Sequence, residues 1–113
     1  LEIPKTIDDY EKMFKILKEK KNVVPYVLAA NAMEFQFTGP FGIMPDFYLK
    51  DLKTVAYGQI QPQFKEYLAL MAKWYKDGYI SKDFPTLKDE QTINLFFSDK
   101  IGMYISSVDV SYN

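Results

Sequence analysis

The stretch that decides the fold runs from residue 62 to residue 80 and reads PQFKEYLALMAKWYKDGYI. Its large apolar residues recur every three or four positions, which is the spacing of one helical face. They are Phe64, Tyr67, Leu68, Met71, Trp74 and Tyr75, and all six are expected to be buried. Pro62 suits a first helical turn, where its missing N–H has no partner to lose. Gly78 suits the left-handed conformation that ends a helix, so Tyr79 and Ile80 should fold back onto the core. This helix, with Trp74 in the core, is expected to organise the domain.

The composition predicts one folded domain over residues 1–113. A chain of 113 residues with 48% hydrophobic and 17% aromatic residues can bury a core of its own. The net charge of −1 provides no basic surface for nucleic acid, so no nucleic-acid partner is expected. The absence of Cys and His excludes thiolate nucleophiles, His-based triads and most zinc sites. No cofactor and no metal site are therefore expected.

The first third of the chain predicts a helix and then a buried strand. Thr6 is a good N-cap, and Asp9 follows three residues later as a short version of the capping box. The helix that follows carries an apolar stripe made of Ile7, Tyr10, Met13, Phe14 and Leu17. The apolar run over residues 23–29 predicts a strand buried on both faces, with Pro25 near its beginning.

The remaining segments predict a hairpin, a helix and a last strand. Residues 47–50 and 54–57 read as a β-hairpin, although its turn lacks the Gly or Asn that tight hairpins prefer. Thr86 with Asp89 repeats the cap pattern before a helix that ends near Ser98. Residues 101–105 read as the last strand. The expected fold class is thus α/β.

Three pieces of sequence, in this order along the chain, carry a family resemblance. They are Pro4-x-Thr6-x-Asp8-Asp9-Tyr10, then Tyr75-x-x-Gly78-x-Ile80 with Phe84, and then Phe97-Ser98-x-Lys100-Ile101-Gly102-Met103. Together they resemble the extracellular solute-binding proteins of ABC importers. The likeness is to the carbohydrate-binding group that includes maltodextrin-binding proteins and lipoproteins of Gram-positive bacteria.

The resemblance implies a periplasmic-binding-protein-like lobe, with a small sheet and a β-hairpin flanked by about four helices. In that family two lobes close on a solute held between them, and this chain resembles most of the second lobe. The implied function is non-catalytic binding of a sugar or oligosaccharide for delivery to ABC permease subunits. The implied location is extracellular, at the cell surface or in the periplasm. The chain begins at Leu1 without a Met or a signal peptide, so it reads as a piece of a longer protein. Any membrane association would come from an anchor outside this piece.

Two loops are the candidate ligand-binding segments, because ligands of open α/β sheets bind outside the carboxyl ends of strands. The resemblance puts the family's contacts on the same two loops. Their candidate residues are Asn31, Glu34, Phe35 and Phe37 in the first, and Ser106, Ser107 and Asp109 in the second. The polar side chains suit sugar hydroxyls, and the Phe rings offer stacking faces. The alternative is that Asn31 caps a helix and that both Phe residues belong to the core.

Two other functions stay open from the residues alone. A glycosidase would need two acids flanking the scissile bond, and Glu34 with Asp109 is the pair that could supply them. An autonomous protein-interaction module would use exposed aromatic residues as its contact surface.

Overall fold

The computed structural model describes residues 2–28 and 36–105 of the chain. The elements in order are α1 (Ile7–Ile16), the π-helical turn η1 (Leu17–Lys21), β1 (Val24–Val27), the 3-10 turn η3 (Gly39–Phe41), β2 (Phe47–Asp51), β3 (Thr54–Tyr57), the 3-10 turn η4 (Gly58–Ile60), α2 (Pro62–Lys76), α3 (Asp89–Phe97) and β4 (Ile101–Tyr104). The fold is mixed α/β, as predicted: β1 and β4 form a parallel pair, and β2 and β3 an antiparallel hairpin. Of the about four helices expected, the described residues contain three α-helices.

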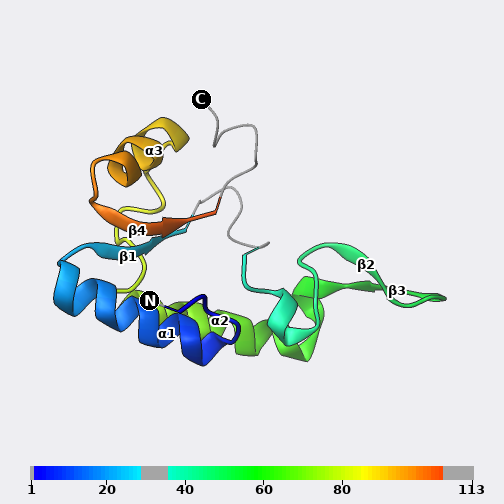
Figure 1. Ribbon diagram of the computed structural model, residues 1–113. Helices are drawn as coiled ribbons and strands as arrows, with labels where there is room; N and C mark the ends of the chain where they lie inside the picture. Colours follow the sequence, from blue (N-terminus) through cyan, green and yellow to red (C-terminus); the bar gives the residue numbers. More distant parts are fainter. Residues whose placement is uncertain (1, 29–35, 106–113) are drawn as a thin grey trace.

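The β1–β4 pair lies between two helical layers. Figure 1 shows α1 and α2 on one side of the pair and α3 on the other, while the β2–β3 hairpin projects away from this body. Residues from α1, β1 and α2 build the core between the sheet and the first helical layer. The buried cluster consists of Phe14, Tyr26, Leu28, Tyr67, Met71, Trp74 and Ile80. Trp74 has no exposed surface, which confirms its assignment to the core.

The predicted beginning of α1 is confirmed in both halves of its capping box. The backbone N–H of Asp9 donates to Thr6 Oγ1 at 3.2 Å, and the backbone N–H of Thr6 donates to Asp9 Oδ2 at 3.1 Å. The apolar stripe of α1 is confirmed too, since Phe14 is buried and its other members pack against the core cluster. The local cap and the stripe together orient α1 towards β1 and α2.

The core-facing stripe of α2 is narrower than predicted. Tyr67, Met71 and Trp74 are buried, but Leu68 and Tyr75 are 41% and 40% exposed. Those two residues stand one position after Tyr67 and Trp74, which turns them about 100° around the helix axis. Their predicted burial is therefore wrong. They line a shallow groove of about 280 Å³ that also includes Phe84.

The chain that follows α2 turns back at Gly78 and joins the sheet within a few residues. Gly78 has a φ of 73°, which is the left-handed conformation predicted for it. The N–H of Tyr79 donates to Trp74 O at 2.8 Å, so the chain folds back at once. Ile80 is buried and forms a parallel bridge with Tyr26, which extends the β1–β4 pair on the free side of β1.

The hairpin forms without Gly or Asn because Asp51 organises its turn. Asp51 Oδ1 accepts hydrogen bonds from the N–H groups of Lys53 at 3.0 Å and Thr54 at 2.7 Å, and the Thr54 hydroxyl donates to Oδ2 at 3.1 Å. An Asp side chain that bonds the backbone two or three residues on replaces the usual turn residues. The pKa of the Asp51 carboxyl is lowered, first by the Thr54 hydroxyl and then by these backbone N–H groups.

The predicted cap of α3 is wrong by two residues. The helix begins at Asp89 with Lys88 in the N-cap position, and the Lys88 N–H donates to Gln91 Oε1 at 2.9 Å. Thr86 does not reach this helix, because its hydroxyl donates to Asp83 O at 3.0 Å within the preceding turn. The competing local hydrogen bond decides the start of the helix.

Candidate functional site

The candidate ligand-binding edge lies at the carboxyl ends of β1 and β4, which point in the same direction in Figure 1. The register pairs Val24 with Ile101, Tyr26 with Met103 and Val27 with Tyr104. Paired strands lie about 4.8 Å apart, so the chain leaves the sheet at neighbouring points after Val27 and after Tyr104. This edge is where open α/β sheets bind their ligands.

The two candidate loops begin side by side at this edge. Six of the predicted ligand-binding residues fall on segments outside the described residues, so their roles stay predictions: Asn31, Glu34, Phe35, Ser106, Ser107 and Asp109. The fold fixes the points from which those segments depart. The two segments are far apart in the sequence, but they follow strand ends that lie next to each other at one edge of the sheet.

Phe37 is the predicted site residue that the structure describes. Its ring packs edge-on against three core rings, at centroid distances of 5.0 Å to Tyr10, 5.5 Å to Tyr26 and 5.0 Å to Trp74. The side chain is partly buried and packs against the core cluster. Its role in ligand binding stays a prediction, but its neighbours are those of a core residue.

The backbone of Phe37 is held in an uncommon conformation, with a φ of 63°. For a bulky residue this left-handed backbone conformation costs about 1–2 kcal/mol of free energy, because Cβ approaches the following carbonyl oxygen. Each edge-on aromatic pair contributes about 0.5–1.5 kcal/mol beyond its area, so three pairs together contribute about 1.5–4.5 kcal/mol, which is enough to offset a cost of this size. The ring contacts therefore offset the cost of this backbone conformation.

The sequence-based reasoning missed two buried polar groups, the Tyr26 hydroxyl and the Gln36 side chain. Gln36 is only 5% exposed, and neither its Oε1 nor the Tyr26 hydroxyl has a hydrogen-bond partner among the described residues. Burial raises the pKa of the Tyr26 hydroxyl far above its ordinary range, and Tyr67 adds to the effect, so Tyr26 stays neutral. The one signal for Gln36 was a polar residue between two Phe residues.

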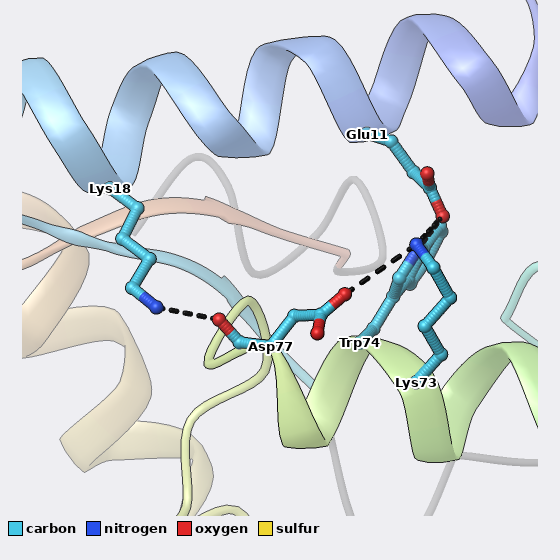
Figure 2. A network of polar contacts seen from close by, with 5 residues as sticks. All are labelled: Glu11, Lys18, Lys73, Trp74 and Asp77. Carbon is cyan, nitrogen blue, oxygen red and sulfur yellow. Dashed lines mark hydrogen bonds and ion pairs between the residues drawn. The ribbon is translucent and has the colours of Figure 1, made fainter.

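Polar contacts join α1 and η1 to α2 and to Asp77, the residue that follows α2, as Figure 2 shows. Glu11 Oε1 accepts hydrogen bonds from Lys73 Nζ at 2.6 Å and from the indole Nε1–H of Trp74 at 2.8 Å. Lys73 also lies 3.5 Å from an Asp77 carboxylate oxygen, and Lys18 Nζ donates to Asp77 O at 2.6 Å. The pKa of Glu11 is lowered by its bond to Lys73 against the opposing effect of burial, and that of Lys73 is raised by its bond to Glu11. These groups satisfy one another, so the network holds the two helices together.

The described residues offer no obvious metal centre. Within residues 2–28 and 36–105, no group of three or more acidic side chains is arranged to hold a metal ion. None of the helices described is long and apolar enough to cross a membrane.

Comparison with known proteins gives a likeness in fold. The chain matches no model of a protein family, and no curated protein sequence matches it. A sugar transporter from Bacillus licheniformis, solved in complex with stachyose, superposes with a TM-score of 0.67 at 19% sequence identity. The superposition covers 92% of this chain but only 29% of that protein. The chain thus shares the fold of part of that transporter and spans less than a third of its length.

Proposed function

We propose that this chain is part of an extracellular solute-binding protein of an ABC importer and forms most of its second lobe. It binds a sugar or oligosaccharide at the edge beyond β1 and β4, without catalysis, for delivery to the permease subunits. The observation that carries this proposal is the parallel pairing of β1 with β4, which starts both candidate loops from neighbouring points. The likeness in fold to a transporter crystallised with stachyose supports a sugar as the ligand.

The proposal assigns the ligand contacts to Asn31 and Glu34 of the first loop and to Ser106, Ser107 and Asp109 of the second. Amide, carboxylate and hydroxyl groups pair with sugar hydroxyls as both donors and acceptors. Phe35 would add a ring face for stacking on a sugar. A second lobe would supply the opposite wall of the site, and closure would follow from contacts that the ligand makes to both lobes.

An isolated lobe keeps only part of these contacts, so the chain alone should bind weakly. We expect titration of the ¹⁵N-labelled chain with stachyose to give shifts at the edge with a Kd of about 1 mM or weaker. The shifts should be confined to amides that follow Leu28 and Ile105, and the β2–β3 hairpin should not respond. Binding in the micromolar range would contradict the two-lobe proposal, and the absence of any shift at the edge would contradict a sugar site.

A matched pair of variants tests the assignment of contacts. Asn31→Ala should reduce the stachyose-induced shifts at the edge, because it removes a predicted ligand contact. Asn94→Ala removes the same side chain from an exposed position of α3 and should leave the shifts unchanged. An equal effect of both variants would show that Asn31 is not a contact.

A protein-interaction role is the second candidate, and the hairpin is the observation in its favour. The register places Phe47 opposite Tyr57 and Leu49 opposite Val55 on one face, and Phe47, Leu49 and Val55 are 73%, 62% and 64% exposed. A continuous apolar face of this kind marks a contact surface. Light scattering that detects a dimer abolished by Leu49→Lys would favour this role, whereas a monomer at all concentrations would count against self-association.

A further inference from the structure

One apolar surface of this chain is a face of the β2–β3 hairpin. The register places Phe47 opposite Tyr57 and Leu49 opposite Val55, and we call these four side chains the hairpin face. Only Tyr57 among them is partly buried, and its ring lies 4.9 Å from that of Phe47. A two-stranded hairpin is marginally stable in water unless one of its faces packs against another element. Because the hairpin projects away from the body of its own copy (Figure 1), that body leaves the hairpin face open.

A second apolar surface is the shallow groove of about 280 Å³ beside α2, which we call the α2 groove. Its lining includes Leu68, Met71 and Tyr75 of α2 together with Ile80 and Phe84 of the segment that follows, and none of the described residues that line it is charged. The rings of Tyr75 and Phe84 meet edge-on at 6.1 Å and form one wall. Leu68 and Tyr75 are well exposed, so the groove is open to a partner.

Charges of opposite sign flank the two surfaces. Asp46 precedes the hairpin face and Asp51 follows it at the turn, about 17 Å further along an extended chain. On α2, Lys65 and Lys76 lie on the same side as Ala72, which lines the groove, and are about 16.5 Å apart. Each Asp can therefore lie opposite a Lys. Asp46 is the stronger of the two acids for this pairing, because the neighbouring lysines of the turn offset the charge of Asp51.

We propose that the hairpin face docks in the α2 groove of a second copy of this chain, and that two copies make this contact reciprocally. The hairpin ends at Tyr57, shortly before α2 begins at Pro62, whereas Met71 and Tyr75 of the groove stand in the C-terminal half of α2. When two copies of α2 run antiparallel about a two-fold axis, each hairpin comes beside the C-terminal half of the other copy's α2. The proposal goes beyond sugar binding and does not rest on it.

The size of the contact explains why both copies take part twice. A fully buried aromatic side chain removes about 150–250 Å² from water, so the exposed parts of the hairpin face and of the groove offer about 500 Å² in one contact. Stable interfaces bury about 1,200–2,000 Å². One contact is therefore too small, whereas two bury about 1,000 Å², which is the range of weak, reversible dimers. We expect a dimer with a Kd of about 100 µM.

Sedimentation equilibrium from about 10 µM to about 1 mM tests the dimer and both of its surfaces. Leu49→Lys and Leu68→Lys each bring a charge into the apolar contact, from positions that are 62% and 41% exposed in the single copy. We expect each variant to raise the Kd at least about tenfold. Leu52→Lys is the matched control, because Leu52 is 95% exposed at the hairpin turn and lies outside the hairpin face. It should change the Kd by less than about twofold.

A pair of surface variants tests the flanking charges without touching either apolar surface. Lys65→Glu combined with Lys76→Glu places like charges opposite the acids of the hairpin and should raise the Kd about threefold to tenfold. The matched control combines Lys20→Glu with Lys21→Glu in η1, which makes the same change at exposed lysines of another element. It should leave the Kd within about twofold.

Mixing the two apolar variants identifies which surface meets which. Leu68→Lys keeps an intact hairpin face, and Leu49→Lys keeps an intact groove, so one contact can form between them. In ¹⁵N-labelled Leu68→Lys, unlabelled Leu49→Lys should shift the amides of residues 47–57. With the labels exchanged, the shifts should fall on residues 68–75 of α2. Neither variant should show these shifts when its own concentration is raised.

Four results would overturn the proposal. A monomer at every concentration would exclude the second copy as the partner. A dimer that survives Leu49→Lys would exclude the hairpin face. A dimer that survives Leu68→Lys would mean that two hairpins meet each other. Mixed variants that produce no shifts would exclude the contact between hairpin and groove.

Discussion

Replacing Glu11 tests whether the polar network between α1 and α2 stabilises the fold. One oxygen of this carboxylate accepts both the ammonium of Lys73 at 2.6 Å and the indole N–H of Trp74 at 2.8 Å. Trp74 is fully buried, so Glu11→Ala leaves its N–H without this acceptor at the edge of the core. Lys73 keeps its ion pair with Asp77 at 3.5 Å and is half exposed to solvent. The cost of the variant should therefore come mainly from Trp74.

The two contributions have different sizes. A buried donor left without a partner costs about 1–3 kcal/mol. An ion pair at the exposed Lys73 contributes about 0–1 kcal/mol after screening by solvent. We therefore expect Glu11→Ala to lower the free energy of unfolding by about 2 kcal/mol, which corresponds to about 6–10 °C in Tm. Glu11→Gln keeps an acceptor for the indole and should cost about 0.5–1 kcal/mol.

Urea denaturation of a double-mutant cycle measures the coupling directly. In a Trp74→Phe background the indole donor is gone, so Glu11→Ala should cost only about 0.5 kcal/mol. An equal cost in both backgrounds, or a Glu11→Gln variant as unstable as Glu11→Ala, would refute the reasoning.

The same network predicts a dependence on pH. The folded state holds the pKa of Glu11 below its ordinary value of 4.5, chiefly through Lys73. The contribution of Glu11 to the free energy of unfolding is therefore complete above pH 4.5. It is lost as the pH falls through the pKa that Glu11 has in the folded state. Glu11→Gln should flatten the stability profile in that acidic range.

Three further changes test local features of the fold. Gly58→Ala would put a Cβ 1.5 Å from Met44 O, so it should lower the free energy of unfolding by about 2–3 kcal/mol, measured by thermal unfolding. The control Gly39→Ala places its Cβ where no atom lies within 4 Å, so it should leave the stability almost unchanged. Thr6→Ala removes the N-cap of α1 and should cost about 1 kcal/mol, seen as a lower urea midpoint; no change would mean that the cap is dispensable. Asp51→Ala should disorder the β2–β3 turn in NMR spectra at neutral pH. Because the pKa of Asp51 is lowered, the unmodified turn should lose order only as the pH falls below the ordinary value of 3.8, and an unchanged hairpin in the variant would contradict its role.

Local chemistry was readable from the sequence wherever a few neighbouring residues decide the outcome. The Thr6–Asp9 cap, the left-handed Gly78 and the core position of Trp74 each depend on contacts that a short pattern encodes. Reasoning from the same patterns failed where two local options compete. The Thr86 hydroxyl donates to Asp83 O in the preceding turn, and Lys88 takes the N-cap position that Thr86 was expected to hold. Leu68 lay at the margin of its helical stripe, where only the neighbouring layer decides burial.

By itself the sequence determined the type and order of the main helices and strands, the absence of thiol and imidazole chemistry, and which two loops carry polar candidates for a ligand. Only the tertiary structure decided that β1 and β4 pair in parallel, and so that those loops begin at one edge. Only the tertiary structure enclosed the ring of Phe37 between α1, β1 and α2. The physical reason is that strand pairing and ring packing join residues distant in sequence, through contacts that no local period encodes.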